Sequence, residues 1–376
     1  MLKQKYFLTG IFILSAERQP IKLAWRKIVW LHIQGARGIC TLMVFFGHAT
    51  GAYNIPWLQN HMNNPLRLLL DGHAAVVFFF VLSGYFYYTD KCITLKQYIY
   101  IIIKRVTRLI PSYWVSIIIG ALLCNYYLKY GISQDNNVSH WFASFWNEPV
   151  TWSRFLNEAK VVFRHAPSNE FINPNSWYLN VDFKMMVIIP VVIFLLNKTY
   201  WWLSGILIFL SVMTTTQCWV AIFLMGATFH RYQERLFVII GKHRWFLGVL
   251  SAVGIILWDV QTWSGINTNI ASNMYRMEII QAVGVILLLT VLLFLSDLPI
   301  LTSRVLLFMG RISYEFYIIH FLFLAGLMPF ISNTWIYIAV CFIGSLLSAI
   351  LLHNGSEWVT FKVLNMNIVA WLKSSK

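Results

Sequence analysis

Charged side chains are scarce in this sequence. Of its 376 residues, 14 are Asp or Glu and 29 are Lys or Arg, so charged residues make up 11% of the chain. Soluble domains carry about 25% charged residues. Apolar runs of roughly twenty residues recur along the chain and leave no polar helix faces of the kind that a soluble fold needs. The shortage of charge therefore excludes an ordinary soluble domain and predicts an all-α, polytopic transmembrane helical bundle.

Cysteine is also scarce. The five cysteines are Cys40, Cys92, Cys124, Cys218 and Cys341. They are scattered, and none has the spacing of a zinc site or a redox pair, so we predict no metal. The sequence also lacks internal repeats and low-complexity segments.

The chain start lacks a cleavable signal. The apolar stretch "YFLTGIFIL" is too short to span a bilayer and has no small-residue cleavage site after it. We therefore expect residues 1–30 to form a cytoplasmic segment with an interfacial helix.

The hydropathy pattern predicts about ten membrane spans. A span needs about 20 predominantly apolar residues. The expected spans are 37–53, 74–89, 109–129, 176–197, 201–213, 217–229, 245–263, 277–297, 313–331 and 335–353. The fifth and sixth are short, so a full crossing and a re-entrant segment are both open for them.

The distribution of basic residues predicts the orientation. With both termini in the cytoplasm, 22 of the 29 Lys and Arg residues fall in cytoplasmic segments and six in exterior ones. The expected cytoplasmic loop 90–108 alone carries five of them. This bias is the positive-inside rule, and it accounts for most of the net charge of +15 without nucleic acid. Anionic membrane lipids are the expected partners of such loops.

The longest expected exterior loop, residues 130–175, is polar but rich in aromatic residues, as in "SHWFASFWNEPVTWSRFLNE". Aromatic side chains near a bilayer are usually interface anchors. Trp and Tyr also stack on sugar rings, so contact with a glycan is the second interpretation of this loop.

Two ionisable residues share the first expected span. Arg37 and His48 are eleven positions apart, which is close to three helical turns, so both side chains should lie on one face. The helical rise between them is about 16 Å. That separation predicts Arg37 at the cytoplasmic mouth and His48 near mid-membrane. An ionisable residue inside the membrane indicates a functional site, but a histidine hydrogen-bonded between helices is an equal alternative on spacing alone.

Further motifs help to decide between a functional and a structural role for His48. The first span is followed by "HAAVVFFFVLSGYFYYTD", "KRVTRLIPSYW", "SWYLNVDFKMMVIIP", "FLMGATFHR" and "GRISYEFYIIHFLF". In this order, with these gaps and behind an Arg-x10-His helix, the chain resembles the bacterial acyltransferase-3 family of integral-membrane O-acyltransferases. The resemblance covers residues 31–358 and leaves 359–376 as a cytoplasmic tail. It implies a multi-pass protein of the bacterial cytoplasmic (inner) membrane.

The resemblance implies a role for several individual residues. His48 falls on the family's catalytic histidine and Arg37 on its paired arginine. Arg105 and Arg108 match the arginines associated with the acyl-coenzyme A donor. Gly84 matches a tight-packing glycine, and we assign Ser83 to packing with it, ahead of a role as nucleophile.

Three further positions match with less certain roles. Trp177 keeps its place in the family's W-x-L-x-x-E run, but the glutamate is replaced by Asp182, whose carboxylate is one methylene shorter. The sequence places Asp182 near the exterior end of its span, with a partner on another helix or on the acceptor. His320 matches the histidine of the late motif, where a structural role is favoured over a chemical one.

The implied chemistry is acyl transfer from acyl-CoA, with acetyl-CoA as the favoured donor. A neutral imidazole can take the proton of a hydroxyl as that hydroxyl attacks a thioester, and burial favours the neutral form of His48. Arginine binds phosphate through a planar fork, which suits coenzyme A. The expected acceptor is a carbohydrate or lipid-linked glycan, by analogy with the family.

Three alternatives remain from the sequence. A secondary transporter also has about ten spans and buried charges, but would usually show two related halves, which are absent here. A non-catalytic membrane protein could keep the same fold without the chemistry. A membrane-bound O-acyltransferase of the other class would carry its histidine in a different motif.

Overall fold

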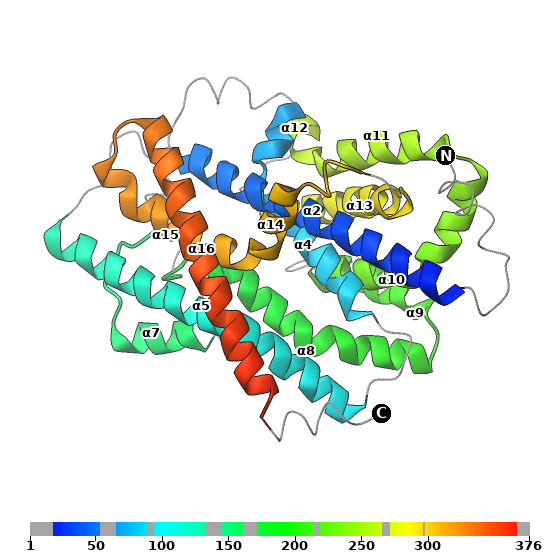
Figure 1. Cartoon of the computed structure of the whole chain (residues 1–376), viewed down its shortest axis with the longest axis horizontal. Helices are drawn as coiled ribbons and strands as arrows, with labels where there is room; N and C mark the ends of the chain where they lie inside the picture. Colours follow the sequence, from blue (N-terminus) through cyan, green and yellow to red (C-terminus); the bar gives the residue numbers. More distant parts are fainter. Residues whose placement is uncertain are drawn as a thin grey trace.

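The computed structural model describes residues 18–52, 65–88, 94–131, 145–160, 171–213, 219–264, 271–295 and 298–366. Within these ranges every regular element is a helix (Figure 1). The α-helices are α2 (Arg18–Ala52), α4 (Gly72–Tyr87), α5 (Leu95–Tyr130), α7 (Trp152–Ala159), α8 (Ser176–Lys198), α9 (Leu203–Met213), α10 (Trp219–Lys242), α11 (Phe246–Trp258), α12 (Val260–Ser264), α13 (Ala271–Phe294), α14 (Arg304–Arg311), α15 (Ser313–Leu327) and α16 (Thr334–Leu364). Two short 3₁₀ helices are η1 (Pro65–Leu70) and η4 (Met328–Phe330).

The helical membrane fold predicted from the sequence is confirmed. Among the described residues, six helices are long and apolar enough to cross a membrane, and α4, α9 and α11 are shorter apolar helices. Each of the ten expected spans overlaps a helix, and the sixth overlaps the longer and more polar α10. The expected span 245–263 is divided between α11 and α12, and 313–331 covers α15 and η4. The count of ten crossings and the cytoplasmic placement of the termini stay predictions.

Several sequence predictions fall outside the described residues. They are the interfacial helix within residues 1–17, Cys92 and Cys218, the parts of the exterior loop at 132–144 and 161–170, and the tail at 367–376. The three described cysteines, Cys40, Cys124 and Cys341, are buried free thiols.

Helix α5 begins much earlier than the apolar run indicated. The expected loop 90–108 is helical from Leu95, so Arg105 and Arg108 lie on α5 and not in a loop. Thr94 starts the helix through a capping box, in which its side chain accepts from the backbone N–H of Gln97 and the Gln97 side chain accepts from that of Thr94. Hydropathy marks the apolar part of a helix and not its ends, so the prediction of a loop was wrong.

The bundle consists of two groups of helices joined by α2, α4 and α8. In one group α10 packs against α9 and α13, and α11 against α13. In the other, α16 packs against both α5 and α15, and α7 lies against α5. Figure 1 shows the two groups on opposite sides of α4 and α8. Helix α2 contacts α4 and α13 as well as α15, so it touches both groups.

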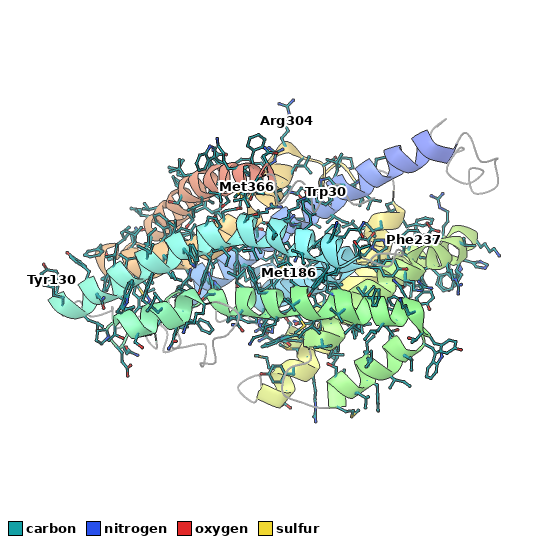
Figure 2. All side chains as sticks on the ribbon, turned by 90° about the horizontal axis from the view of Figure 1, so that it is seen from below. Trp30, Tyr130, Met186, Phe237, Arg304 and Met366 are labelled. Atoms are coloured by element: carbon teal, nitrogen blue, oxygen red, sulfur yellow. The ribbon has the colours of Figure 1, made fainter. Side chains whose placement is uncertain are left out.

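The outer surface of the bundle is apolar. Exposed side chains include Trp114 and Leu122 on α5, Leu195 on α8 and Leu351 on α16. In Figure 2 side chains stand outward along the whole length of the bundle, from Tyr130 at one end of α5 to Phe237 on α10. Such a surface requires lipid as its surroundings.

The segment before α8 enters the bundle. Asn173 is fully buried, and its Nδ2 donates to the carbonyl of Ile318 at 2.6 Å. Nδ2 of Asn175 donates to the carbonyl of Tyr317 at 2.8 Å. These bonds satisfy backbone oxygens of α15 and hold the chain inside the protein, so α8 begins within the bundle and not at its edge.

Helices α4 and α10 meet at two glycines. A Cβ on Gly84 would lie 2.0 Å from the carbonyl oxygen of Phe223, and one on Gly226 would lie 2.0 Å from that of Val81. No real side chain fits at these distances, so the backbones are in direct contact, as small residues allow in membrane helices. This contact confirms the packing role that the sequence assigned to Gly84.

We predict that Gly84→Ala lowers stability by about 1–3 kcal/mol, because the added methyl group forces α4 and α10 apart. Gly355→Ala is the matched control, since nothing lies within 4 Å of its Cβ position on α16 and alanine favours a helix by up to about 1 kcal/mol. Thermal unfolding of the two purified variants in detergent measures the difference. Equal melting temperatures would contradict direct contact at Gly84.

Candidate functional site

A cavity of about 330 Å³ lies between α2, α4, α5, α8 and α15. Its lining consists of Trp30, Arg37, Val76, Phe79, Leu82, Ser83, Phe86, Arg105, Arg108, Leu109, Tyr178, Leu179, Asp182, Ser313, Tyr314 and Tyr317. Three arginines and one aspartate therefore face a space whose other walls are mostly apolar and aromatic. Such a mixture of apolar walls and few polar groups is typical of a ligand site.

Arg37 is held by neutral groups. Its Nη2 donates to Oγ of Ser313 at 2.6 Å, and its Nη1 donates to Oε1 of Gln34 at 3.3 Å. Ser313 begins α15, so this contact connects α2 to the start of that helix. Among the described residues Arg37 forms no ion pair with a carboxylate, and Arg108 lies close enough to repel it.

Arg105 is held differently, by a carboxylate. Its Nη1 lies 3.5 Å from Oδ2 of Asp182 and donates a short hydrogen bond to the hydroxyl of Tyr87. The guanidinium also lies over the Tyr87 ring, 4.3 Å from the centroid. Arg105 is therefore fixed between α4 and α8, and much of its charge is balanced by Asp182.

Asp182 lines the cavity with the arginines and pairs with Arg105. The sequence placed Arg105 on the cytoplasmic side and Asp182 near the exterior end of its span, and two residues in contact cannot occupy both positions. Which membrane side the pair lies nearer stays a prediction. The expectation of a partner on another helix is confirmed by Arg105.

Arg108 is one turn beyond Arg105 and lines the same cavity. In the part of the chain that the structure describes, it makes no hydrogen bond or ion pair. The cavity thus presents Arg37 and Arg108 together, while its one carboxylate pairs with Arg105. A pair of arginines without a carboxylate favours an anion, above all a phosphate.

His48 and His320 form a hydrogen-bonded pair. Nδ1 of His48 lies 2.9 Å from Nε2 of His320, and the rings are stacked with centroids 5.1 Å apart. His320 is fully buried, and its Nδ1 lies 3.1 Å from the carbonyl oxygen of Phe316. His48 is partly exposed. Close to it, a Cβ on Gly72 would lie 4.0 Å from Nε2 of His48.

The histidine pair adjoins the arginine cavity along α15. Arg37 and His48 contact α15 at Ser313 and His320, two turns apart, so they share the face that their spacing predicted. Between these contacts, Tyr317 lines the cavity, and its ring centroid is 6.0 Å from that of His320. One side of α15 thus connects the cations to the imidazoles.

The remaining predicted residues divide between the cavity and its surroundings. Ser83 lines the cavity, next to the Tyr178 hydroxyl with which it hydrogen-bonds. Gly84 faces α10 and not the cavity. Trp177 is also outside the lining and contacts His73 and Trp219 instead.

Sequence reasoning missed several polar residues of the site. Tyr87 and Tyr178 were within quoted motifs, but hydroxyl-bearing aromatic residues carry no periodic signal of their own. His73 and Glu278 form a 2.8 Å ion pair between α4 and α13. The sequence did contain a signal for His73 and Glu278, because each is an ionisable residue in an apolar stretch.

Comparison with known families agrees with this geometry. A family model described as an acyltransferase domain, of the acyltransferase-3 type, matches residues 30–354. The chain belongs to the acyltransferase-3 family. No curated protein and no solved structure matches it.

As an acyltransferase-3 protein, the chain is a membrane protein with an acyltransferase domain. Its described residues contain no group of three or more His, Cys, Asp or Glu side chains that could hold a metal ion.

We predict that Asp182→Asn lowers activity more than Asp182→Glu. The asparagine removes the negative charge that holds Arg105, whereas the glutamate keeps it at the cost of one methylene. We expect the acyl-transfer rate of the asparagine variant to be at least about tenfold lower than that of the glutamate variant, which corresponds to about 1.4 kcal/mol. Acyl-transfer assays of the purified variants measure it.

Glu234→Gln is the control, because it removes a carboxylate at an exposed position of α10. The reverse order, with glutamate worse than asparagine, would show that the side-chain length at Asp182 matters more than its charge.

Proposed function

We propose that the protein transfers an acyl group, in the first instance acetyl, from acyl-CoA to a hydroxyl of a surface polysaccharide or of its lipid-linked precursor. The observation that carries this proposal is the arginine-lined cavity that adjoins the His48–His320 pair. Membership of the acyltransferase-3 family supports the acyl transfer. The excess of basic residues on one side supports a location in the bacterial cytoplasmic membrane.

The donor is bound through its phosphates in this proposal. Arg37 and Arg108 face the cavity as cations without a carboxylate between them, and their planar forks suit phosphate oxygens. Arg105 contributes as a cation positioned by Asp182. The apolar walls suit the long arm of coenzyme A, and the rise of about 16 Å from Arg37 to His48 lets the arm extend along α2.

His48 is the general base in this scheme. It takes the proton of the acceptor hydroxyl as the oxygen attacks the thioester carbonyl. The tetrahedral intermediate then collapses, the carbon–sulfur bond breaks, and the proton returns from His48 to the departing thiolate. The products are an ester of the acceptor and free coenzyme A, so the enzyme ends in its starting protonation state.

The hydrogen bonds around His320 support Nε2 as the nitrogen of His48 that accepts the proton. The Phe316 carbonyl can only accept, so in a neutral His320 ring Nδ1 carries the hydrogen and Nε2 holds a lone pair. His48 must then donate from Nδ1 to that lone pair, which leaves its own Nε2 unprotonated. In this proposal His320 is a positioning residue for the base, as the aspartate is for the histidine of a Ser-His-Asp triad.

We predict that His48→Ala lowers transfer roughly a hundred- to ten-thousandfold, the usual loss when a general base is removed. Acetyl-CoA binding and the amount of protein in the membrane should stay unchanged. The measurement is mass spectrometry of surface glycans from cells that carry each variant, looking for acetyl groups. His243→Ala is the control, since His243 is exposed at the end of α10.

Normal acetylation by well-expressed His48→Ala protein would overturn the assignment. The histidine pair would then act only as a hydrogen bond that joins α2 to α15.

We further predict that His320→Gln and His320→Leu differ in activity although both remove the imidazole. Glutamine can place an amide oxygen near the position of Nε2 and accept from Nδ1 of His48, so it should retain most of kcat. Leucine cannot accept, and the wrong tautomer of a base costs up to about ten-thousandfold in a known triad. Steady-state kinetics should show the loss in kcat and not in the KM for acetyl-CoA, and equal rates would exclude the positioning role.

A further inference from the structure

A second ionisable pair lies next to the proposed base. Nε2 of His73 is 2.8 Å from Oε1 of Glu278, which joins the start of α4 to α13. The Glu278 side chain is only 1% exposed, whereas that of His73 is 25% exposed. A buried carboxylate therefore holds an imidazole that is still accessible from outside. Burying such a pair costs free energy, so a contribution to stability is a weak explanation for its presence.

Aromatic rings from three helices continue from this pair. The His73 ring is nearly parallel to that of Trp177, with 14° between the planes and 6.3 Å between the centroids. Trp177 is 6.3 Å from Trp219, and Trp219 is 6.3 Å from Tyr275. All four residues are partly buried, so each keeps some exposed surface. The rings of Trp177, Trp219 and Tyr275 also pack against the main hydrophobic core.

Two buried side chains in this region have hydrogen-bonding atoms without partners among the described residues. The indole N–H of Trp219 is buried and has no acceptor among the described residues. Gln281, one turn after Glu278 on α13, is fully buried, and neither its Oε1 nor its Nε2 has a partner within the described ranges. An unsatisfied buried amide is costly, and each such group in a protein calls for a cause.

The cluster lies beside the atom that would accept the proton. Gly72 directly precedes His73, and its Cβ position is 4.0 Å from Nε2 of His48. One turn further along α4, Val76 lines the arginine cavity. Gly72, His73 and Val76, all near the start of α4, therefore adjoin His48, the aromatic rings and the arginine cavity, respectively.

We propose that His73, Glu278, Trp177 and Trp219 form a carbohydrate subsite that holds the acceptor next to His48. Pyranose rings present a flat face of C–H groups, which packs on indole rings, and a rim of hydroxyls, which hydrogen-bonds to imidazole, carboxylate and amide groups. Glu278 orients His73 from behind, and Trp177 forms the adjacent apolar wall. This inference rests on the proposed function and specifies its acceptor as a sugar ring.

The test uses the full-length protein in lipid nanodiscs and oligosaccharides released from the envelope polysaccharide of the producing cells. Isothermal titration calorimetry measures their binding without any donor. We expect about tenfold weaker binding in Trp177→Leu and in Glu278→Gln, which corresponds to about 1.4 kcal/mol. Trp177→Phe keeps an aromatic wall and should bind within about threefold of the unaltered protein. Trp202→Leu removes an exposed tryptophan near the start of α9 and should change nothing.

Kinetics with acetyl-CoA separate this subsite from the proposed function. The KM for the oligosaccharides should rise in Trp177→Leu, with the dissociation constant of acetyl-CoA unchanged. Oligosaccharides that bind all variants equally, or that do not bind the unaltered protein, would overturn the subsite. Oligosaccharide binding that depends on Trp177, in a protein that transfers no acyl group, would support the subsite and overturn the proposed reaction instead.

Discussion

A polar group inside this bundle is costly unless the protein or a ligand supplies its partner, because lipid offers none. The buried charges are therefore found where helices meet. Arg105 joins α5 to Asp182 on α8, His73 joins α4 to Glu278 on α13, and Glu315 on α15 lies 3.3 Å from His353 on α16. These pairs connect helices that are far apart in the sequence, and they also collect the reactive groups in the interior.

Helix α15 is the element on which most of these contacts depend. Its side chains are almost all buried. Ser313 accepts from Arg37, His320 meets His48, and the carbonyl of Ile318 accepts from Asn173. The same helix therefore positions the paired arginine, supports the proposed base and admits the segment that sets the depth of α8. A change in the position of α15 would alter the whole site at once.

In the proposed reaction the donor and the acceptor approach one base from different parts of the bundle. The cations Arg37 and Arg108 face the cavity at one end of the shared α2–α15 contact, and His48 stands at the other. On the far side of His48, the start of α4 begins a cluster of a different chemistry, with an imidazole, a carboxylate and indole rings. In the proposed reaction the phosphate-bearing donor and the sugar acceptor therefore both reach His48.

The sequence by itself determined the helices and the groups that one helix carries. The apolar runs located a helix at each expected span, although 245–263 is divided between α11 and α12. The helical period placed Arg37 and His48 on one face, and both signals are local. The motif order identified the family, and the glycine at position 84 indicated close packing, which the contact with Phe223 confirms.

Only the tertiary structure decided which groups meet across helices. His48 and His320 are 272 residues apart, and His73 and Glu278 are 205 apart, so no local pattern could pair them. The contact of Asp182 with Arg105 could not be read from the sequence either, because the two residues lie on different helices and hydropathy had assigned them to opposite membrane sides. Local periodicity fixes the direction of a side chain on its own helix, whereas its partner is set by packing and by the need to satisfy buried polar groups.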